Sequence, residues 1–188
     1  MKIIDLSTER EKLRSFYRVV GFVSLVIIII TTIYGVVASI IQGVNVVGET
    51  LVTLEVPPIS VFPLFYSKPI TWLSASLFAL FFSALELGKD DVLKWSKPRR
   101  DILKFIAFFV GSMAAYEVMF NFTLWGGLIA SDSILGELNV DLIKNTFPNP
   151  NTPWNIVFAT KLFTVVMIIS SYAFYYLQKI ESKIEKRL

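Results

Sequence analysis

The chain of 188 residues is 54% apolar, only 18% of its residues are charged, and its mean hydropathy is +0.62. A soluble domain of this length usually carries about 45–50% apolar and about 25% charged residues, so the composition excludes an ordinary soluble globule. The formal net charge of +3 comes from Lys and Arg residues near the ends of apolar runs. Because no basic helix or stacking platform accompanies them, we expect no nucleic-acid partner.

The sequence contains neither His nor Cys. This excludes disulfides, thiol nucleophiles and Fe–S clusters, and also haem, copper and zinc sites built on imidazole. Carboxylates remain as strong metal ligands for Mg²⁺, Ca²⁺ or Mn²⁺, but no catalytic or phosphate-binding motif gathers them, so we expect no cofactor. Low Gln and Cys with many Ile, Lys and Glu would suit a thermophile, although AT-rich codon usage explains Ile and Lys equally well.

Four apolar runs are long enough to cross a bilayer, whose hydrocarbon of about 30 Å takes about 20 helical residues. The runs cover residues 19–41, 70–87, 105–129 and 154–177. No alternation of period two runs through them, so helices are the only plausible spans. We therefore predict an all-α integral membrane protein, with a single membrane domain over residues 1–188 built as a bundle of four transmembrane helices.

The basic residues predict the orientation of the spans. Of the 18 Lys and Arg residues, 15 lie in the arm 1–18, the loop 88–104 and the tail 178–188. The other three are Lys68, Lys144 and Lys161. Since cytoplasmic loops carry the excess of Lys and Arg, we expect both termini and the middle loop in the cytoplasm of a cell membrane, with external loops at 42–69 and 130–153.

Local signals predict where the helices begin. Thr8 followed by Glu11 forms a capping box, so the first helix should begin in the cytoplasm and run unbroken into the membrane. Its apolar run exceeds the about 7–15 residues of a signal peptide, which argues against cleavage. Pro98 and Pro153 suit the first turns of the third and fourth helices.

The external loops contain two predicted elements. Residues 49–56 alternate as a short strand would, and Pro57 with Pro58 would end that strand. Residues 132–147 place apolar side chains at helical spacing, which predicts a short amphipathic helix on the outer leaflet or on a partner. The apolar residues of that helix are Leu135, Leu138, Leu142 and Ile143.

At the cytoplasmic end, an apolar stripe continues the fourth helix beyond the membrane. Its residues are Leu177, Ile180, Ile184 and Leu188. Such a stripe needs cover, which we expect from the N-terminal arm or from a soluble partner, while binding to the membrane surface is equally compatible.

Small residues recur at intervals of four along three of the spans. They are Gly35, Ser39 and Gly43 in the first, Ala75, Ala79 and Ser83 in the second, and Ala107, Gly111 and Ala115 in the third. Residues four apart share a helix face, and small side chains let helix backbones approach closely. The stripes favour dense packing, within this chain or against another one, over chance occurrence of residues common in membrane spans.

Three polar residues inside the spans are candidates for a functional site. Glu117 lies midway along the third span, where a carboxylate is costly, and Asn121 follows one turn later on the same face. A proton relay or ligand contact is one interpretation of Glu117, and a neutral carboxyl hydrogen-bonded to a neighbouring helix is the other. Lys161 lies nearer the outer end of the fourth span, from where it reaches either towards Asn121 or up towards the headgroups.

These observations lead to three hypotheses of function. The leading one is a non-catalytic integral subunit that packs within a larger membrane complex, such as a respiratory or other membrane oxidoreductase complex, with the bilayer and other membrane subunits as partners. The second is a small oligomeric carrier or channel whose pathway is lined by Glu117 and Asn121. The third is an enzyme or quinone-linked subunit that relies on carboxylates alone. The lack of any catalytic constellation favours a chain that is not itself an enzyme.

Overall fold

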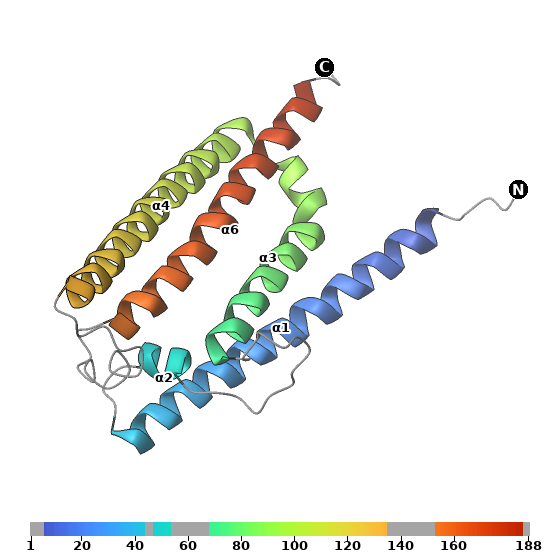
Figure 1. Cartoon of the computed structure of the whole chain (residues 1–188). Coiled ribbons are helices and arrows are strands. Elements are labelled where there is room, and N and C mark those ends of the chain that lie inside the picture. The colour runs from blue at the N-terminus through green and yellow to red at the C-terminus, as the bar shows by residue number, and fades with distance from the viewer. Residues whose placement is uncertain (1–5, 44–46, 54–67, 135–152, 186–188) are drawn as a thin grey trace, which may run out of the picture.

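A computed structural model of the chain describes residues 6–43, 47–53, 68–134 and 153–185. All secondary structure in these residues is helical. The helices are α1 (Leu6–Gln42), α2 (Val47–Thr53), α3 (Pro69–Lys94), α4 (Lys97–Ile134) and α6 (Pro153–Glu185) (Figure 1). The four longer helices are long and apolar enough to cross a membrane, which confirms the prediction of an all-helical, multi-pass membrane architecture.

The helices extend well beyond the predicted spans. α1 runs unbroken, as expected, but begins at Leu6, before the predicted cap at Thr8. α4 begins at Lys97 with Pro98 in its first turn, and α6 begins at Pro153, so both proline predictions are confirmed. The predicted middle loop is mostly helix, because ion pairs three residues apart, such as Lys94–Asp91 at 3.2 Å, support the polar end of α3.

The prediction of a strand over residues 49–56 is wrong, because Val47–Thr53 forms α2. An alternating pattern of this length does not distinguish a strand from a short helix whose several faces are all buried. α2 buries Gly48, Thr50, Leu51 and Val52 and contacts α1, α3 and α6. Residues 54–67 lie outside the described residues, and so does nearly all of the amphipathic helix predicted over 132–147.

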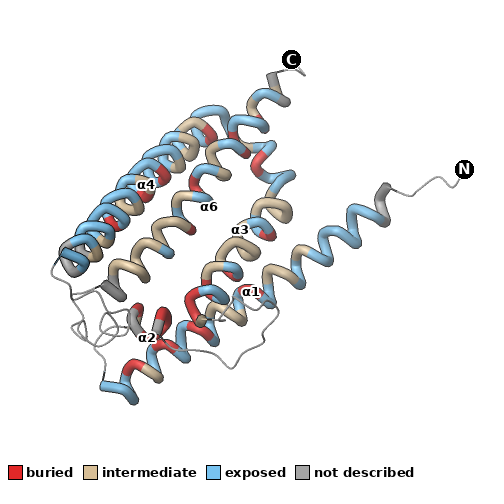
Figure 2. Tube along the Cα trace, in the orientation of Figure 1, coloured by how far each residue is buried: buried red, intermediate tan, exposed pale blue. Residues whose placement is uncertain are grey.

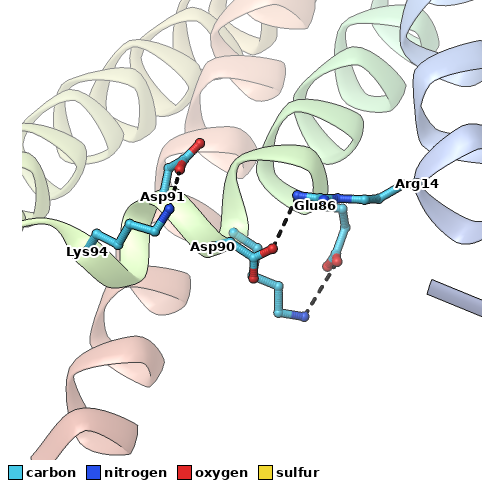
Figure 3. Close-up of polar contacts among 6 residues, drawn as sticks. Arg14, Glu86, Asp90, Asp91 and Lys94 are labelled. Carbon is cyan, nitrogen blue, oxygen red and sulfur yellow. Dashed lines mark hydrogen bonds and ion pairs between the residues drawn. The ribbon is translucent and has the colours of Figure 1, made fainter. Parts of the chain in front are cut away.

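α1 and α3 form one antiparallel pair. Near one end, Arg14 of α1 bonds Asp90 of α3 at 3.2 Å (Figure 3). Further along, Gly21 of α1 faces Ser83 of α3, and a Cβ atom built at Gly21 would lie 3.3 Å from the Ser83 Cβ. As the residue number rises along α1, the residue that it contacts on α3 falls, so the two helices are antiparallel. These two contacts define their register.

α4 and α6 form a second antiparallel pair. Lys104 of α4 pairs with Glu181 of α6, and Gly111 of α4 lies against Ser170 of α6. α3 joins the two pairs through α6, where the rings of Phe82 and Tyr172 have centroids 4.8 Å apart.

The four long helices therefore lie in the order α1, α3, α6, α4 (Figure 1). Although only Trp95 and Ser96 separate α3 from α4, no Cα atoms of these two helices come within 8 Å of each other. α6 lies between them instead. The bundle is thus open, with α1 and α4 at its two edges, and Figure 2 shows long exposed stretches on both edge helices.

Two apolar clusters hold the pairs together. One joins Leu51 and Val52 of α2 to Ile70 and Leu73 of α3. The other lies at the opposite end of the bundle and consists of Val92, Tyr176, Leu177 and Ile180, with Trp95, Leu103 and Ile184 packed against it.

The second cluster corrects an expectation about the apolar stripe at the end of α6. The end of α3 and Leu103 of α4 cover Leu177 and Ile180, rather than the N-terminal arm or a soluble partner. Helix α3 can provide this cover because it continues to Lys94, well past its apolar run. Leu188 lies outside the described residues.

Candidate functional site

The register of α4 and α6 brings polar residues of the two helices together. A cavity of about 200 Å³ lies between the helices, in the half of the pair that contains the start of α6. Its walls are Asn121, Phe122 and Trp125 of α4 with Ile156, Val157, Thr160 and Lys161 of α6. Asn121 and Lys161, both singled out in the sequence, thus line the same space.

Asn121 is the most enclosed polar group of this cavity. Its side chain is only 7% exposed, and its Nδ2 atom has no hydrogen-bond partner among the described residues. Thr160 does not supply the acceptor: its hydroxyl donates to the Ile156 carbonyl oxygen at 2.6 Å, and its oxygen accepts no hydrogen bond from Asn121. A buried amide N–H without an acceptor is costly, so the enclosed Nδ2 group of Asn121 destabilises this part of the bundle.

Lys161 is exposed at the rim of the same cavity. No carboxylate lies within ion-pair distance of its Nζ atom in the part of the chain that the structure describes, and the charged group acting on it is another cation, Lys68. The cavity therefore has almost wholly apolar walls, with Lys161 exposed at its rim and the Nδ2 atom of Asn121 enclosed beside it.

Glu117 stands apart from this cavity. It lies one turn before Asn121 on α4, is half-buried, and lines neither cavity between the helices. No hydrogen bond or ion pair joins it to another described residue, so the expected bond to a Ser, Thr or Asn of a neighbouring helix is not present there. The structure brings Asn121 and Lys161 together and leaves Glu117 without a partner in the described chain.

The stripes of small residues lie in three different settings. Gly35 is buried against Leu51 of α2, where an added Cβ would come within 2.7 Å of a Leu51 methyl group. Gly111 faces Ser170, and Ser83 faces Gly21, which the sequence analysis did not single out. Of the remaining residues, Ser39 is buried, Ala79, Ala107 and Ala115 are half-buried, and Ala75 and Gly43 are exposed. Gly43 ends α1 with a φ of 66°, a conformation that favours glycine.

The sequence analysis missed a larger cavity at the opposite end of the bundle. It measures about 320 Å³ and lies where α3 and α4 diverge on either side of α6. Leu85, Trp95, Ala107, Ser170 and Tyr176 are among its lining residues. Only the divergence of two helices joined by a short turn creates this space, and nothing in the sequence pattern signals that divergence.

Charged side chains gather around the same end of the bundle. Lys104 pairs with both Asp101, at 2.7 Å, and Glu181. The guanidinium of Arg99 stacks 4.2 Å from the ring centroid of Trp95. On α3, Lys89 pairs with Glu86 at 3.6 Å beside the Arg14–Asp90 bond (Figure 3). Within the described ranges, no three Asp or Glu residues come together as a metal-binding group.

Comparison with protein-family models, curated proteins and solved structures finds no match to this chain.

Proposed function

We propose that the chain is a non-catalytic integral subunit that packs within and stabilises a larger membrane complex. The observation that carries this proposal is Glu117, a carboxyl group near the middle of α4 with no hydrogen-bond or ion-pair partner among the described residues. A neighbouring subunit would supply the partner that the described chain does not.

The cost of the unpaired carboxyl supports this interpretation. Glu117 is 20 residues from the start of α4 and 17 from its end. A charged group at such a depth costs from about 3 to more than about 10 kcal/mol. Even a protonated carboxyl needs a hydrogen-bond partner in an apolar medium. The described residues alone leave this cost uncompensated, whereas an interhelical hydrogen bond to another subunit would remove most of it.

The open order of the helices also supports a neighbour beside α4. α4 lies at an edge of the bundle and, among the described helices, packs along its length against α6 alone. Its free side carries large apolar residues near Glu117 that include Met113, Tyr116, Met119 and Phe120, all exposed. A contiguous apolar and aromatic surface of this kind suits both lipid and the helix of another subunit.

The size of the complex and two substitutions of Glu117 test the proposal. Native electrophoresis after extraction in a mild detergent should show a large heteromeric band. Glu117→Gln, which keeps the shape and a hydrogen-bonding group, should preserve that band. Glu117→Leu should weaken assembly by about 1–2 kcal/mol, the scale of an interhelical hydrogen bond in a membrane. This corresponds to about a five- to thirty-fold loss of assembled complex at limiting concentration.

Met113→Leu is the matched control, because Met113 lies about one turn before Glu117 on the exposed side of α4. It should leave assembly unchanged. The proposal fails if the chain migrates alone in mild detergent and Glu117→Leu has no more effect than the control. A complex that assembles fully with Glu117→Gln but loses its activity would instead assign proton transfer to Glu117.

We also propose that both termini lie in the cytoplasm, on the strength of the charge distribution. The start of α1, the turn at Trp95 and the end of α6 lie at one end of the bundle, and the basic segments accompany them (Figure 1). Because the chain has no Cys, single cysteines report the orientation without background. Ser96→Cys and Ser182→Cys should react only with reagent added inside, and Ser60→Cys and Ser133→Cys only from outside. Labelling of Ser96→Cys and Ser133→Cys from the same side would contradict this.

A small homo-oligomeric carrier is the alternative that one observation favours. Asn121 and Lys161 line one cavity, as residues of a pathway would. Glu117, the other residue expected in such a pathway, does not line it. The same native gel separates the two proposals, because a carrier of this kind would migrate as an oligomer of this chain alone.

A further inference from the structure

The larger cavity lies in a gap that no described helix fills. α3 and α4 extend from the short turn at Trp95 on either side of α6, and no Cα atoms of the two helices come within 8 Å of each other (Figure 1). The cavity measures about 320 Å³. An apolar cavity of about 150 Å³ already stays free of water and holds a molecule of benzene. The gap therefore has room for a longer apolar group.

The walls of this cavity are almost wholly apolar and follow the axes of the helices. On α4 the lining residues extend from Leu103 to Val110, and on α6 they extend from Ile169 to Leu177. At 1.5 Å per residue, these stretches are about 10 Å and about 12 Å long. An occupant of the cavity therefore has to be apolar and elongated along the helices, as a hydrocarbon chain of the bilayer is.

One end of the cavity lies at the basic end of the bundle. Trp95 lines the cavity, and the Arg99 guanidinium lies 4.2 Å from the centroid of its ring. The segment 88–104 carries six Lys and Arg residues against three Asp residues. The cavity thus begins at the level of a basic turn and continues between the apolar spans, as the chain of a lipid continues below its headgroup.

Two cations of this turn have no acidic partner. Neither Arg99 nor Arg100 pairs with a carboxylate among the described residues. Arg100 is buried and donates to the Trp95 carbonyl oxygen, so it holds the turn beside the cavity. Arg99 is exposed in the first turn of α4, together with Lys97. Basic groups beside a cavity between membrane helices attract the headgroups of anionic lipids.

We propose that this cavity holds one acyl chain of a phospholipid with an anionic headgroup, whose phosphate lies beside Arg99 and Lys97. Such a lipid brings an apolar chain and an anion to the two levels where the bundle has an apolar cavity and exposed cations. A helix of another subunit would match the walls alone, unless it carried acidic residues at the level of the turn. The proposal is independent of the role of Glu117 in assembly, because Glu117 does not line this cavity.

Native mass spectrometry of the purified full chain in a non-ionic detergent tests the site with two lipids. Dioleoyl phosphatidylglycerol and dioleoyl phosphatidylcholine have the same chains and differ in headgroup charge. One phosphatidylglycerol should bind per chain, at least about fivefold more tightly than phosphatidylcholine, which is the scale of one basic residue near an anionic headgroup. Glycerol 1-phosphate, which has the charge but no chain, should not compete.

Substitutions that fill the cavity test where the chain lies. Ala107 of α4 and Ala173 of α6 both line it. Ala107→Leu or Ala173→Leu should reduce the affinity for both lipids about tenfold, because the leucine occupies space that the acyl chain needs. Ala130→Leu is the matched control, since Ala130 is exposed towards the opposite end of α4 and does not line the cavity. Elution volume and thermal midpoint without lipid would verify that each variant folds.

A second pair of variants tests the headgroup. Arg99→Gln should remove most of the preference for phosphatidylglycerol and leave the binding of phosphatidylcholine unchanged. Lys12→Gln removes the same charge from an exposed position of α1, at the other edge of the bundle, and should leave the preference unchanged.

Several results would overturn the proposal. Equal affinity of the two lipids, or a preference that persists in Arg99→Gln, would show that the basic turn does not hold the headgroup. Unchanged affinity in both Ala107→Leu and Ala173→Leu would show that the acyl chain lies elsewhere. If these two variants also lost the heteromeric band on the native gel, the gap would be assigned to a helix of another subunit. Lipid binding as expected by a chain that migrates alone would refute the subunit function and leave this site standing.

Discussion

The two antiparallel pairs of this bundle bury polar groups in different ways. Short side chains of α1 and α3 are buried or half-buried, namely Gly21, Ser24, Thr31, Ser76 and Ser83, and of these Gly21 and Ser83 face each other. The Ser83 hydroxyl donates to the Ala79 carbonyl oxygen of its own helix at 2.7 Å. Its polarity is therefore satisfied locally, and the two helices can approach without a cavity at this level.

The seam between α4 and α6 instead holds groups that need partners from outside their own helix. Lys104 finds Glu181 across the seam, but the Asn121 amide finds no partner in the described chain. Both cavities border this seam. At the level of Ser83, a hydroxyl bonded to its own helix accompanies close approach of the two helices, whereas at the level of Asn121 an unpartnered amide nitrogen lies beside a cavity.

The largest effect is expected at the ion pair of the second seam. Lys104 and Glu181 are only 18% and 15% exposed, so Lys104→Met would leave an enclosed carboxylate with Lys97 alone, at 3.9 Å. Breaking one partner of an enclosed pair costs about 3 kcal/mol. The free energy of unfolding in detergent should fall by that amount, while Lys94→Met, whose pair with Asp91 is three-quarters exposed, should change it by less than about 0.5 kcal/mol. Equal effects of Lys104→Met and Lys94→Met would show that enclosure of the ion pair does not determine its contribution to stability.

A smaller effect is expected where the helices approach most closely. A Cβ at Gly111 would lie 3.3 Å from the Ser170 Cβ and 3.8 Å from the backbone nitrogen of Ser171. Gly111→Leu should therefore lower the free energy of unfolding by about 1–3 kcal/mol, since a backbone cannot yield as a side chain can. Gly21→Leu should cost less, because among the described residues the atoms within 4 Å of its Cβ belong to the Ser83 side chain, which can move.

Gly126→Leu is the control for both glycine variants, because no atom of another described helix lies within 4 Å of a Cβ at that position. Thermal unfolding of the three variants in one detergent gives the order directly. Destabilisation by Gly126→Leu as large as that by Gly111→Leu would mean that the leucine acts through the detergent or the helix itself, and not through the seam.

The smallest effect is expected at the ion pair of the first seam. Arg14 and Asp90 bridge α1 and α3, but their side chains are 52% and 65% exposed (Figure 3). Such an exposed pair contributes about 0.2–1 kcal/mol, and salt screens it. Arg14→Gln should lower the unfolding free energy by that amount in low salt and by almost nothing in 1 M salt. An effect that does not depend on salt would point to packing of the Arg14 side chain.

The sequence predicts the four membrane helices because each carries enough apolar residues in one run. It does not predict the length of α3, because a polar helical end that includes Lys89 and Asp90 has the hydropathy of a loop. It also does not predict which helices pair. Spacing of four shows that Gly35 is on a face with Ser39, but the residue that Gly35 meets is Leu51 of α2.

The sequence likewise predicts the polar residues of the site but not their arrangement. Depth along each helix singles out Asn121 and Lys161, because polar groups are costly there. That they line one cavity follows only from the antiparallel register of α4 and α6, which contacts as distant as Lys104–Glu181 help to set. Glu117 lies one turn before Asn121 on the same face, and which of the two turns borders the cavity depends on the packing between the helices, which hydropathy does not specify.

The position of α6 between α3 and α4 affects the order in which the chain can assemble during synthesis. Once α3 has been synthesised, it can pack against α1 and complete the first antiparallel pair. α4 emerges next, but its long neighbour α6 begins only at Pro153. Before α6 is made, no other helix of the described chain covers Asn121 and Glu117. We therefore expect insertion machinery or an already assembled subunit to shelter α4 during that interval.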